Sequence, residues 1–179
     1  LSPSGAARLA GGRGGPGEHS RSPRLHGFWL ERHGIDGVYL PLAVRPENLQ
    51  TALASLSALG FAGCNLTIPH KEAALRLIDE TTPFAAEIGA VNTVIVRKDG
   101  SLLGDNSDAF GFIENLRSAS PNFDPTAGPT VVLGAGGAAR ARGGAASPGA
   151  PTARPQSSTA PDAGLLQNMT CRVFTRRPL

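Results

Sequence analysis

Apolar residues recur at two different spacings along the middle of this 179-residue chain, and the change from one spacing to the other predicts its elements. The segment "SPRLHGFWLERHG" has the spacing of a helix, with one face formed by Leu25, Phe28, Trp29 and Arg32. Pro23 suits the first turn of such a helix, and Gly34 suits the position after its last turn. The next segment, "GVYLPLAV", is typical of a strand.

A second amphipathic helix is predicted in "RPENLQTALASLSALG", where Gly60 ends a face formed by Leu49, Leu53, Leu56 and Leu59. "GCNLTIP" predicts a short strand and "HKEAALRLID" a helix. "AVNTVIVRKDGSLLGDN" predicts a hairpin that turns at Asp99-Gly100, and "SDAFGFIENLRS" predicts a further helix. This alternation indicates an α/β domain, in which helices cover a parallel or mixed sheet.

Both ends of the chain lack these periods. Residues 1–17 are rich in Gly, Ala and Arg, and we expect them to be irregular. Residues 143–179 form a low-complexity tail that we expect to be disordered, because its long stretch of Gly, Ala, Pro and Ser offers too little apolar surface to offset the entropy of ordering.

Composition narrows the functional classes. The formal charge of +3 is mild and the arginines lie mostly at the two ends, so a nucleic-acid-binding face is not supported. No apolar run approaches the ~18 residues of a membrane span. The cysteines, Cys64 and Cys171, lack metal-binding spacing, which predicts reduced thiols, no metal site and a cytoplasmic location.

The most reactive arrangement of side chains is in "NLTIPHK". Asn65 and Thr67 lie two apart at the end of a predicted strand, so they are expected to point to the same side. Lys71 follows at the start of a helix, where the helix dipole disfavours an ammonium ion and favours proton transfer. The alternative from periodicity alone is an exposed surface lysine beside ordinary turn residues.

Two further clusters of polar residues precede predicted helices. In "GDNSDAFGF", Ser107 is expected to cap the helix, and Asp108 either complements the helix dipole or handles a proton for a hydroxylated ligand. In "EHSRSPRLH", Ser20 and Ser22 either hold a carboxylate or phosphate at the helix N-terminus or serve as plain caps.

A glycine-rich turn follows the predicted strand at Val131. Its residues are Gly134, Ala135, Gly136, Gly137 and Ala138. A strand leading directly into such a turn is the context of a dinucleotide-binding site, although the pattern departs from G-x-G-x-x-G.

Taken together, "HSRSPRLH", "GCNLTIPHKEAA", "IGAVNT", "GDNSDAFGF" and "VVLGAGGAAR" resemble the shikimate dehydrogenase family. The resemblance implies a three-layer substrate-binding domain over residues 18–125 and the first strand and glycine turn of a Rossmann-type NADP domain over residues 126–142. It implies reversible, NADP-dependent conversion of shikimate to 3-dehydroshikimate in aromatic amino-acid biosynthesis.

The same resemblance assigns roles to individual residues. It makes Lys71 and Asp108 the catalytic pair. It implies that shikimate is bound by Ser20, Ser22, Asn65, Thr67, Lys71, Asn92 and Asp108, with the serines at the carboxylate. It places the NADP pyrophosphate against residues 134–138.

The chain departs from the family at both ends. The N-terminal strand is represented only by "GGPGEHS", and the family pattern stops after Arg140. We interpret both ends as truncated or frame-disrupted translation of a GC-rich gene. This leaves two alternatives: a non-catalytic remnant of the substrate-binding domain, and a quinate/shikimate dehydrogenase that uses NAD. The oligomeric state stays open.

Overall fold

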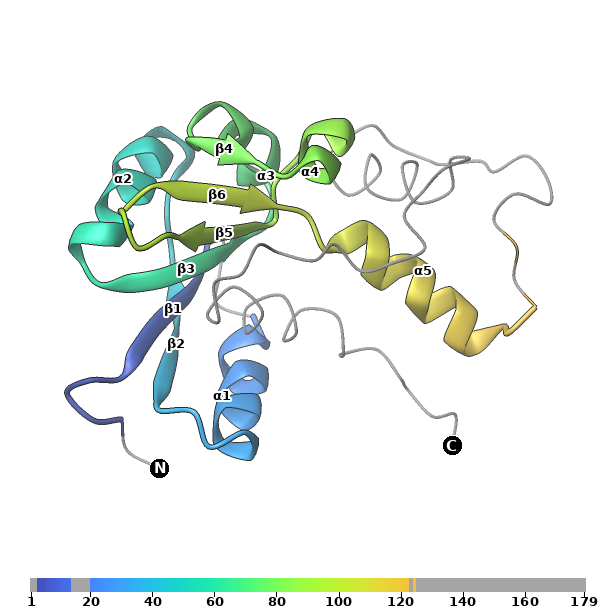
Figure 1. Cartoon of the computed structure of the whole chain (residues 1–179), viewed down its shortest axis with the longest axis horizontal. Helices are drawn as coiled ribbons and strands as arrows, with labels where there is room; N and C mark the ends of the chain where they lie inside the picture. Colours follow the sequence, from blue (N-terminus) through green and yellow to red (C-terminus); the bar gives the residue numbers. More distant parts are fainter. Residues whose placement is uncertain (1–2, 14–19, 123, 125–179) are drawn as a thin grey trace.

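Six β-strands form one sheet in the computed structural model of this chain, which describes residues 3–13, 20–122 and 124 (Figure 1). The strands are β1 (Arg8–Arg13), β2 (Gly37–Leu42), β3 (Phe61–Leu66), β4 (Glu80–Thr81), β5 (Thr93–Val96) and β6 (Leu102–Asp105). The helices are α1 (Ser22–Arg32), α2 (Leu49–Ala58), α3 (His70–Ala73), α4 (Pro83–Ile88) and α5 (Asp108–Ala119), with short 3₁₀ turns η1 (Pro46–Asn48) and η2 (Ala74–Arg76).

The sheet is mixed, with strand order β2-β1-β3-β5-β6-β4. β1 runs parallel to both β2 and β3, whereas β5 runs antiparallel to both β3 and β6. The prediction of an α/β domain with a mixed sheet is therefore confirmed. The hairpin is confirmed as well: β5 and β6 pair directly, and Gly100 takes the left-handed conformation (φ 86°) in the turn between them.

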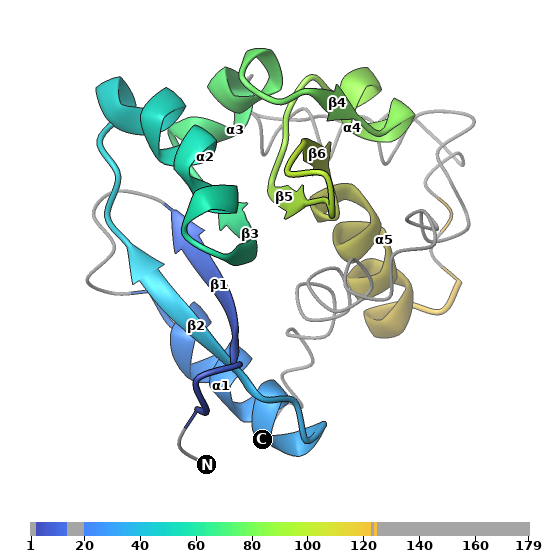
Figure 2. The same ribbon diagram turned by 60° about the vertical axis from the view of Figure 1, so that its left-hand side comes forward.

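Helices α1 and α2 pack on opposite faces of the sheet. Side chains alternate along a strand, so Cys64 and Leu66 of β3 share the face that packs against the buried leucines of α2. Tyr39 of β2 belongs to the other face, where its ring stacks on His26 of α1. The two helices with the sheet between them make the three layers, and Figure 2 shows α1 behind the ribbons of β1 and β2.

Helix α2 confirms the predicted leucine face at three of its four positions. Leu49, Leu53 and Leu56 are buried in the main core, but Leu59 is 61% exposed. The helix ends at Ala58, and Leu59 occupies the cap, so it no longer follows the helical spacing that would turn it inward. The backbone turns away at Gly60, which has φ 72°.

The face of α1 that meets the sheet differs from the predicted one. His26 and Leu30 are its buried residues, whereas Phe28 is 52% exposed. Helical spacing alone marked Phe28 and Trp29, but the sheet presents the flat ring of Tyr39, which stacks on the imidazole of His26 at 3.8 Å and 5°. The predicted helix limits are otherwise confirmed, with a proline in the first turn and Gly34 in the left-handed conformation after the end.

The prediction that residues 1–17 are irregular is wrong for residues 8–13. These residues form β1, which lies between β2 and β3 and pairs with both. The strand lacks a hydrophobic pattern because it contains Gly11 and Gly12. Side chains of the neighbouring strand fill the space that side chains at these two positions would occupy. A Cβ on Gly11 would lie 2.5 Å from Leu42 Cδ1, and one on Gly12 would lie 2.6 Å from the Tyr39 hydroxyl. Backbone hydrogen bonds to β2 on one side and to β3 on the other stabilise this strand.

The other predicted segments, the Rossmann strand and glycine turn of residues 126–142 and the tail of residues 143–179, lie outside the described residues.

Close packing at β1 predicts that Gly11→Ala destabilises the fold. The added methyl would press on Leu42 and lie 3.1 Å from the Leu40 carbonyl oxygen, so we expect a loss of about 1–3 kcal/mol in urea unfolding. Gly27→Ala is the matched control, because a Cβ there has nothing within 4 Å and lies in helix α1. It is expected to stabilise by about 0.5–1 kcal/mol. Unchanged stability of Gly11→Ala would contradict the packing.

Burial of His26 predicts a loss of stability in acid. Burial lowers the pKa of His26 to about 4, and its Nδ1 atom has no hydrogen-bond partner among the described residues. As the pH falls from about 6.5 to 4, the unfolded chain takes up a proton at this position and the folded chain does not. Stability present above pH 6.5 is therefore lost over this window, by up to about 3 kcal/mol.

The measurement is the free energy of unfolding against pH for His26→Phe, which keeps an aromatic ring against Tyr39 but cannot titrate. We expect it to lose this part of the pH dependence, and the exposed-site control His33→Gln to retain it. Equal slopes in both variants would show that another group is responsible.

Candidate active site

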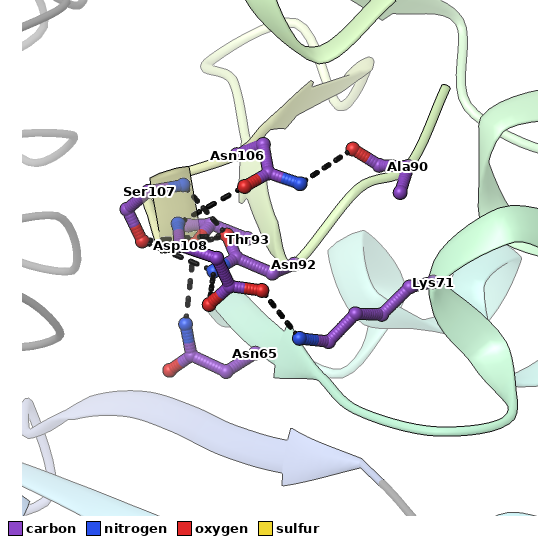
Figure 3. A network of polar contacts seen from close by, with 8 residues as sticks. All are labelled: Asn65, Lys71, Ala90, Asn92, Thr93, Asn106, Ser107 and Asp108. Carbon is purple, nitrogen blue, oxygen red and sulfur yellow. Dashed lines mark hydrogen bonds and ion pairs between the residues drawn. The ribbon is translucent and has the colours of Figure 1, made fainter. Parts of the chain in front are cut away.

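An ion pair between Lys71 and Asp108 lies at the centre of the candidate site (Figure 3). Lys71 Nζ donates to Asp108 Oδ2 at 2.5 Å, across 37 positions of sequence. The side chains are 13% and 30% exposed, so the pair is largely sheltered but still open to a small molecule. Charge-assisted hydrogen bonds of this kind hold both groups in one geometry.

The direction of three strands brings these residues together. β3 and β6 both run antiparallel to β5. Their C-terminal ends therefore lie beside the N-terminal end of β5, at one end of the strands, which we call the site edge of the sheet. Asn65 pairs with Thr93, and Thr93 pairs with Asp105 across this edge. Helix α3 leaves the edge shortly after β3, and helix α5 leaves it after β6. Residues far apart in sequence therefore meet at the edge.

Backbone hydrogen bonds fix the connecting segments. The carbonyl of Lys71 accepts from the Val91 N–H at 2.8 Å, and the carbonyl of Asn92 accepts from the Leu66 N–H at 2.8 Å. The buried His70 ring adds a further anchor, because its Nε2 atom lies 2.8 Å from the carbonyl oxygen of Val44. Lys71 is thus held through its own carbonyl group and through the residue that precedes it.

Helix α3 is shorter than the sequence predicts. It spans only His70–Ala73 before the 3₁₀ turn η2 begins, whereas a helix over all of "HKEAALRLID" was expected. So short a helix has only a small dipole, and Lys71 meets the carboxylate of Asp108 instead of an opposing helix field. The dominant electrostatic partner of Lys71 is therefore Asp108.

Asn106, and not Ser107, provides the side-chain cap of α5. Ser107 occupies the N-cap position, as predicted, but its side chain makes no cap hydrogen bond, so the prediction is confirmed for the position and wrong for the capping bond. Asn106 Oδ1 accepts from the Asp108 N–H at 3.0 Å, and its amide nitrogen donates to the Ala90 carbonyl at 2.8 Å. The Ser107 hydroxyl instead contacts the amide of Asn92, which is buried beside it.

Asn92 orients the carboxylate of Asp108. Its amide nitrogen donates to Asp108 Oδ1 at 2.6 Å and to Ser107 Oγ at 3.1 Å, so both amide hydrogens are engaged. Its Oδ1 accepts from the Ser107 N–H at 3.1 Å and from the Thr93 hydroxyl at 2.8 Å. Asn92 is therefore bonded to protein groups on both its nitrogen and its oxygen.

Asn65 of β3 extends this network from Thr93 of β5 to Tyr39 of β2. Its amide nitrogen donates to Thr93 Oγ1 at 3.3 Å, and its Oδ1 accepts from the Tyr39 hydroxyl at 3.1 Å. Sequence reasoning missed both Tyr39 and Thr93. A signal existed for Thr93, because Asn92 and Thr93 interrupt an apolar run in "AVNTVIV". No local pattern pointed to Tyr39, which reaches Asn65 only through strand pairing.

Three predicted substrate-binding residues are not part of the network drawn in Figure 3. Thr67 is exposed and follows the end of β3 at Leu66, so the argument from strand alternation does not extend to it. Ser20 and Ser22 lie at the start of α1, where the hydroxyl of Ser20 accepts from the Ser22 N–H at 3.3 Å. The N-cap of α1 is Arg21, and Ser22 is the first helical residue.

The glycine turn predicted to bind NADP, Gly134 to Ala138, lies outside the described residues. Within residues 3–13, 20–122 and 124, no three His, Cys, Asp or Glu side chains group to hold a metal ion. No helix in this part of the chain is long and apolar enough to cross a membrane.

The double role of Asn106 predicts a large effect of Asn106→Ala. This change leaves the Asp108 N–H and the Ala90 carbonyl without their side-chain partner in a buried position, so we expect about 2–4 kcal/mol of destabilisation in urea unfolding. Asn48→Ala is the control, since Asn48 also precedes a helix but is exposed and makes no side-chain cap bond. It should stay within about 0.5 kcal/mol of the unsubstituted chain. Similar losses at both positions would contradict the assignment.

Comparison with known proteins points to one family. Residues 13–94 match the family described as the shikimate dehydrogenase substrate binding domain. The shikimate dehydrogenase (NADP(+)) of Paramagnetospirillum magneticum is 64% identical over 138 residues, which are 77% of this chain and 50% of that protein. The chain therefore spans about half the length of the curated relatives it matches.

Solved structures share the same fold. A shikimate 5-dehydrogenase from Thermus thermophilus, crystallised in complex with NADP(H) and shikimate, is 44% identical with a TM-score of 0.67, over 75% of this chain and 49% of that one. A 5-ketofructose reductase from a Gluconobacter strain is 33% identical with a TM-score of 0.68, over 77% of this chain and 48% of that one. The fold is thus shared by enzymes named for different substrates.

Proposed function

We propose that this chain, whose residues 13–94 belong to the shikimate dehydrogenase substrate-binding domain family, binds shikimate and supplies the proton-handling half of an NADP-dependent shikimate dehydrogenase. The observation that carries the proposal is the sheltered ion pair of Lys71 and Asp108. The relative from P. magneticum, which is named for this activity, gives the proposal its substrate and cofactor.

The proposed chemistry is simplest in the direction of reduction. A hydride reaches the carbonyl carbon of 3-dehydroshikimate while the ammonium of Lys71 donates a proton to the carbonyl oxygen, which gives the C3 hydroxyl of shikimate. Lys71 is left neutral and regains its proton from solvent. In the direction of oxidation, neutral Lys71 accepts the proton of the hydroxyl. Asp108 keeps Lys71 in place during both steps.

The proposed hydride donor and acceptor is NADP, which carries the redox chemistry when bound. The residues predicted to hold it, Gly134 to Ala138, lie outside the described part of the chain, and no step is assigned to them. The residues around Lys71 and Asp108 are proposed to transfer the proton and to bind the substrate.

Substrate contacts divide into direct and indirect ones. We propose that Asn65 and Thr67 contact ring hydroxyls and that Ser20 and Ser22 receive the carboxylate at the start of α1. Asn92 has both amide hydrogens bonded to protein oxygens, which favours an action through Asp108 over a direct contact. The predicted cytoplasmic location stays a prediction, as do the absence of a nucleic-acid partner and the use of NADP over NAD.

A second candidate function is a binding domain without turnover. The observation that favours it is the length of the match, since the chain corresponds to half of each curated relative. The two functions share the shikimate site and differ only in hydride transfer, so binding and turnover must be measured separately.

The test is to titrate the purified chain with shikimate by calorimetry and to follow NADPH formation. If the chain turns over, Lys71→Ala is expected to lower kcat by about 10²- to 10⁴-fold, because the proton donor and acceptor is lost. Lys98→Ala, at an exposed lysine beside the β5–β6 turn, is the control and should leave kcat unchanged. Binding without turnover would favour the second candidate, and failure to bind shikimate would contradict both.

A further inference from the structure

In the hydrogen-bond chain from Asp108 to Tyr39, the donor and the acceptor of each bond are determined by two groups, the Asp108 carboxylate and the backbone N–H of Ser107. The ionised carboxylate of Asp108 can only accept, and the backbone N–H of Ser107 can only donate. Asn92 lies between them, with its nitrogen 2.6 Å from Asp108 Oδ1 and its oxygen 3.1 Å from the Ser107 nitrogen. Its amide therefore has one allowed orientation, because the reverse one would place the amide oxygen against the Asp108 carboxylate and the amide N–H groups against the Ser107 N–H.

Thr93 links the orientation of the Asn92 amide to that of the Asn65 amide. Its hydroxyl has a single hydrogen, which it donates to Asn92 Oδ1 at 2.8 Å, and it is fully buried. With that hydrogen used, Thr93 can only accept from its other neighbour, so the nitrogen of Asn65 must face it at 3.3 Å. The oxygen of Asn65 then faces Tyr39, whose hydroxyl must be the donor at 3.1 Å.

Tyr39 is suited to this role by its surroundings. Its ring is buried and stacked on His26, and its hydroxyl occupies the space left by the missing side chain of Gly12. Burial raises the pKa of Tyr39, with a smaller contribution from Cys64, so the phenol keeps the hydrogen that it donates. Several contacts from α1, β1 and β3 thus hold one hydroxyl against one amide oxygen.

We propose that Tyr39 is a positioning residue that fixes the amide of Asn65, so that Asn65 offers its second N–H to an acceptor oxygen of the ligand held beside Lys71. One hydrogen of that amide is bonded to Thr93, and the oxygen is bonded to Tyr39, which leaves the second hydrogen for a ligand. Asn65 then recognises the oxygen of a hydroxyl or a carbonyl group on the ligand. The identity of that ligand as shikimate rests on the proposed function above.

The first measurement needs no ligand. The side-chain amide signals of Asn65 in the ¹H–¹⁵N spectrum of the full chain are identified by their loss in Asn65→Asp. We expect Tyr39→Phe and Thr93→Val to shift or broaden this pair of signals, because each removes one of its two partners. Ile113→Val is the control for a general loss of packing, since Ile113 is buried in the separate cluster of α4 and α5. Unchanged Asn65 signals in Tyr39→Phe would overturn the inference.

The second measurement is the dissociation constant of shikimate for the same variants. Tyr39→Phe is expected to weaken binding by about 3- to 10-fold, the effect of one hydrogen bond, and Ile113→Val to leave it unchanged. Altered Asn65 signals with unaltered affinity would overturn the role in ligand recognition. If the unsubstituted chain binds no shikimate, the proposed function fails together with the ligand part of this inference, and the Asn65 signals still decide whether Tyr39 orients the amide.

Discussion

The carboxylate of Asp108 sets the arrangement of the polar side chains around it. It accepts from the ammonium of Lys71 on one oxygen and from the amide of Asn92 on the other, and its own backbone N–H is bound by Asn106. Each of these partners is largely or fully buried, so a group without a hydrogen bond would cost free energy. The need to satisfy all of them leaves one set of orientations, which extends through Thr93 to Asn65.

The sheet makes this arrangement possible by placing three strand ends at one edge. β5 reverses the direction of the chain between β3 and β6, so the ends of two distant segments meet at the beginning of β5. The hairpin at Gly100 is therefore more than a connection, because it sets the register that puts Thr93 opposite Asp105, and the pairing of β5 with β3 puts Thr93 opposite Asn65. Stability of the sheet and geometry of the site depend on the same backbone pairing.

Strand β1 shows how far sequence patterns reach in this protein. Its two glycines carry no hydrophobic signal, and the pattern predicts an irregular segment. In the fold it is an inner strand of the sheet, because Tyr39 and Leu42 of the neighbouring strand fill the space above Gly12 and Gly11. A prediction from the hydrophobic pattern depends on the side chains of the segment itself, whereas the side chains that pack over this strand belong to β2.

The sequence by itself determined the succession of helices and strands, the leucine face of α2, the Asp99-Gly100 hairpin and the resemblance that singled out Lys71 and Asp108. These features depend on residues that are close in the chain, and local spacing records them. Only the tertiary structure decided that residues 8–13 form an inner strand, that Asn106 and not Ser107 caps α5, and that Tyr39 belongs with Asn65. The physical reason is a partner that lies far away in sequence. Strand pairing places residues 8–13 and Tyr39, and the distant Ala90 carbonyl and Asn92 amide hold the side chains of Asn106 and Ser107.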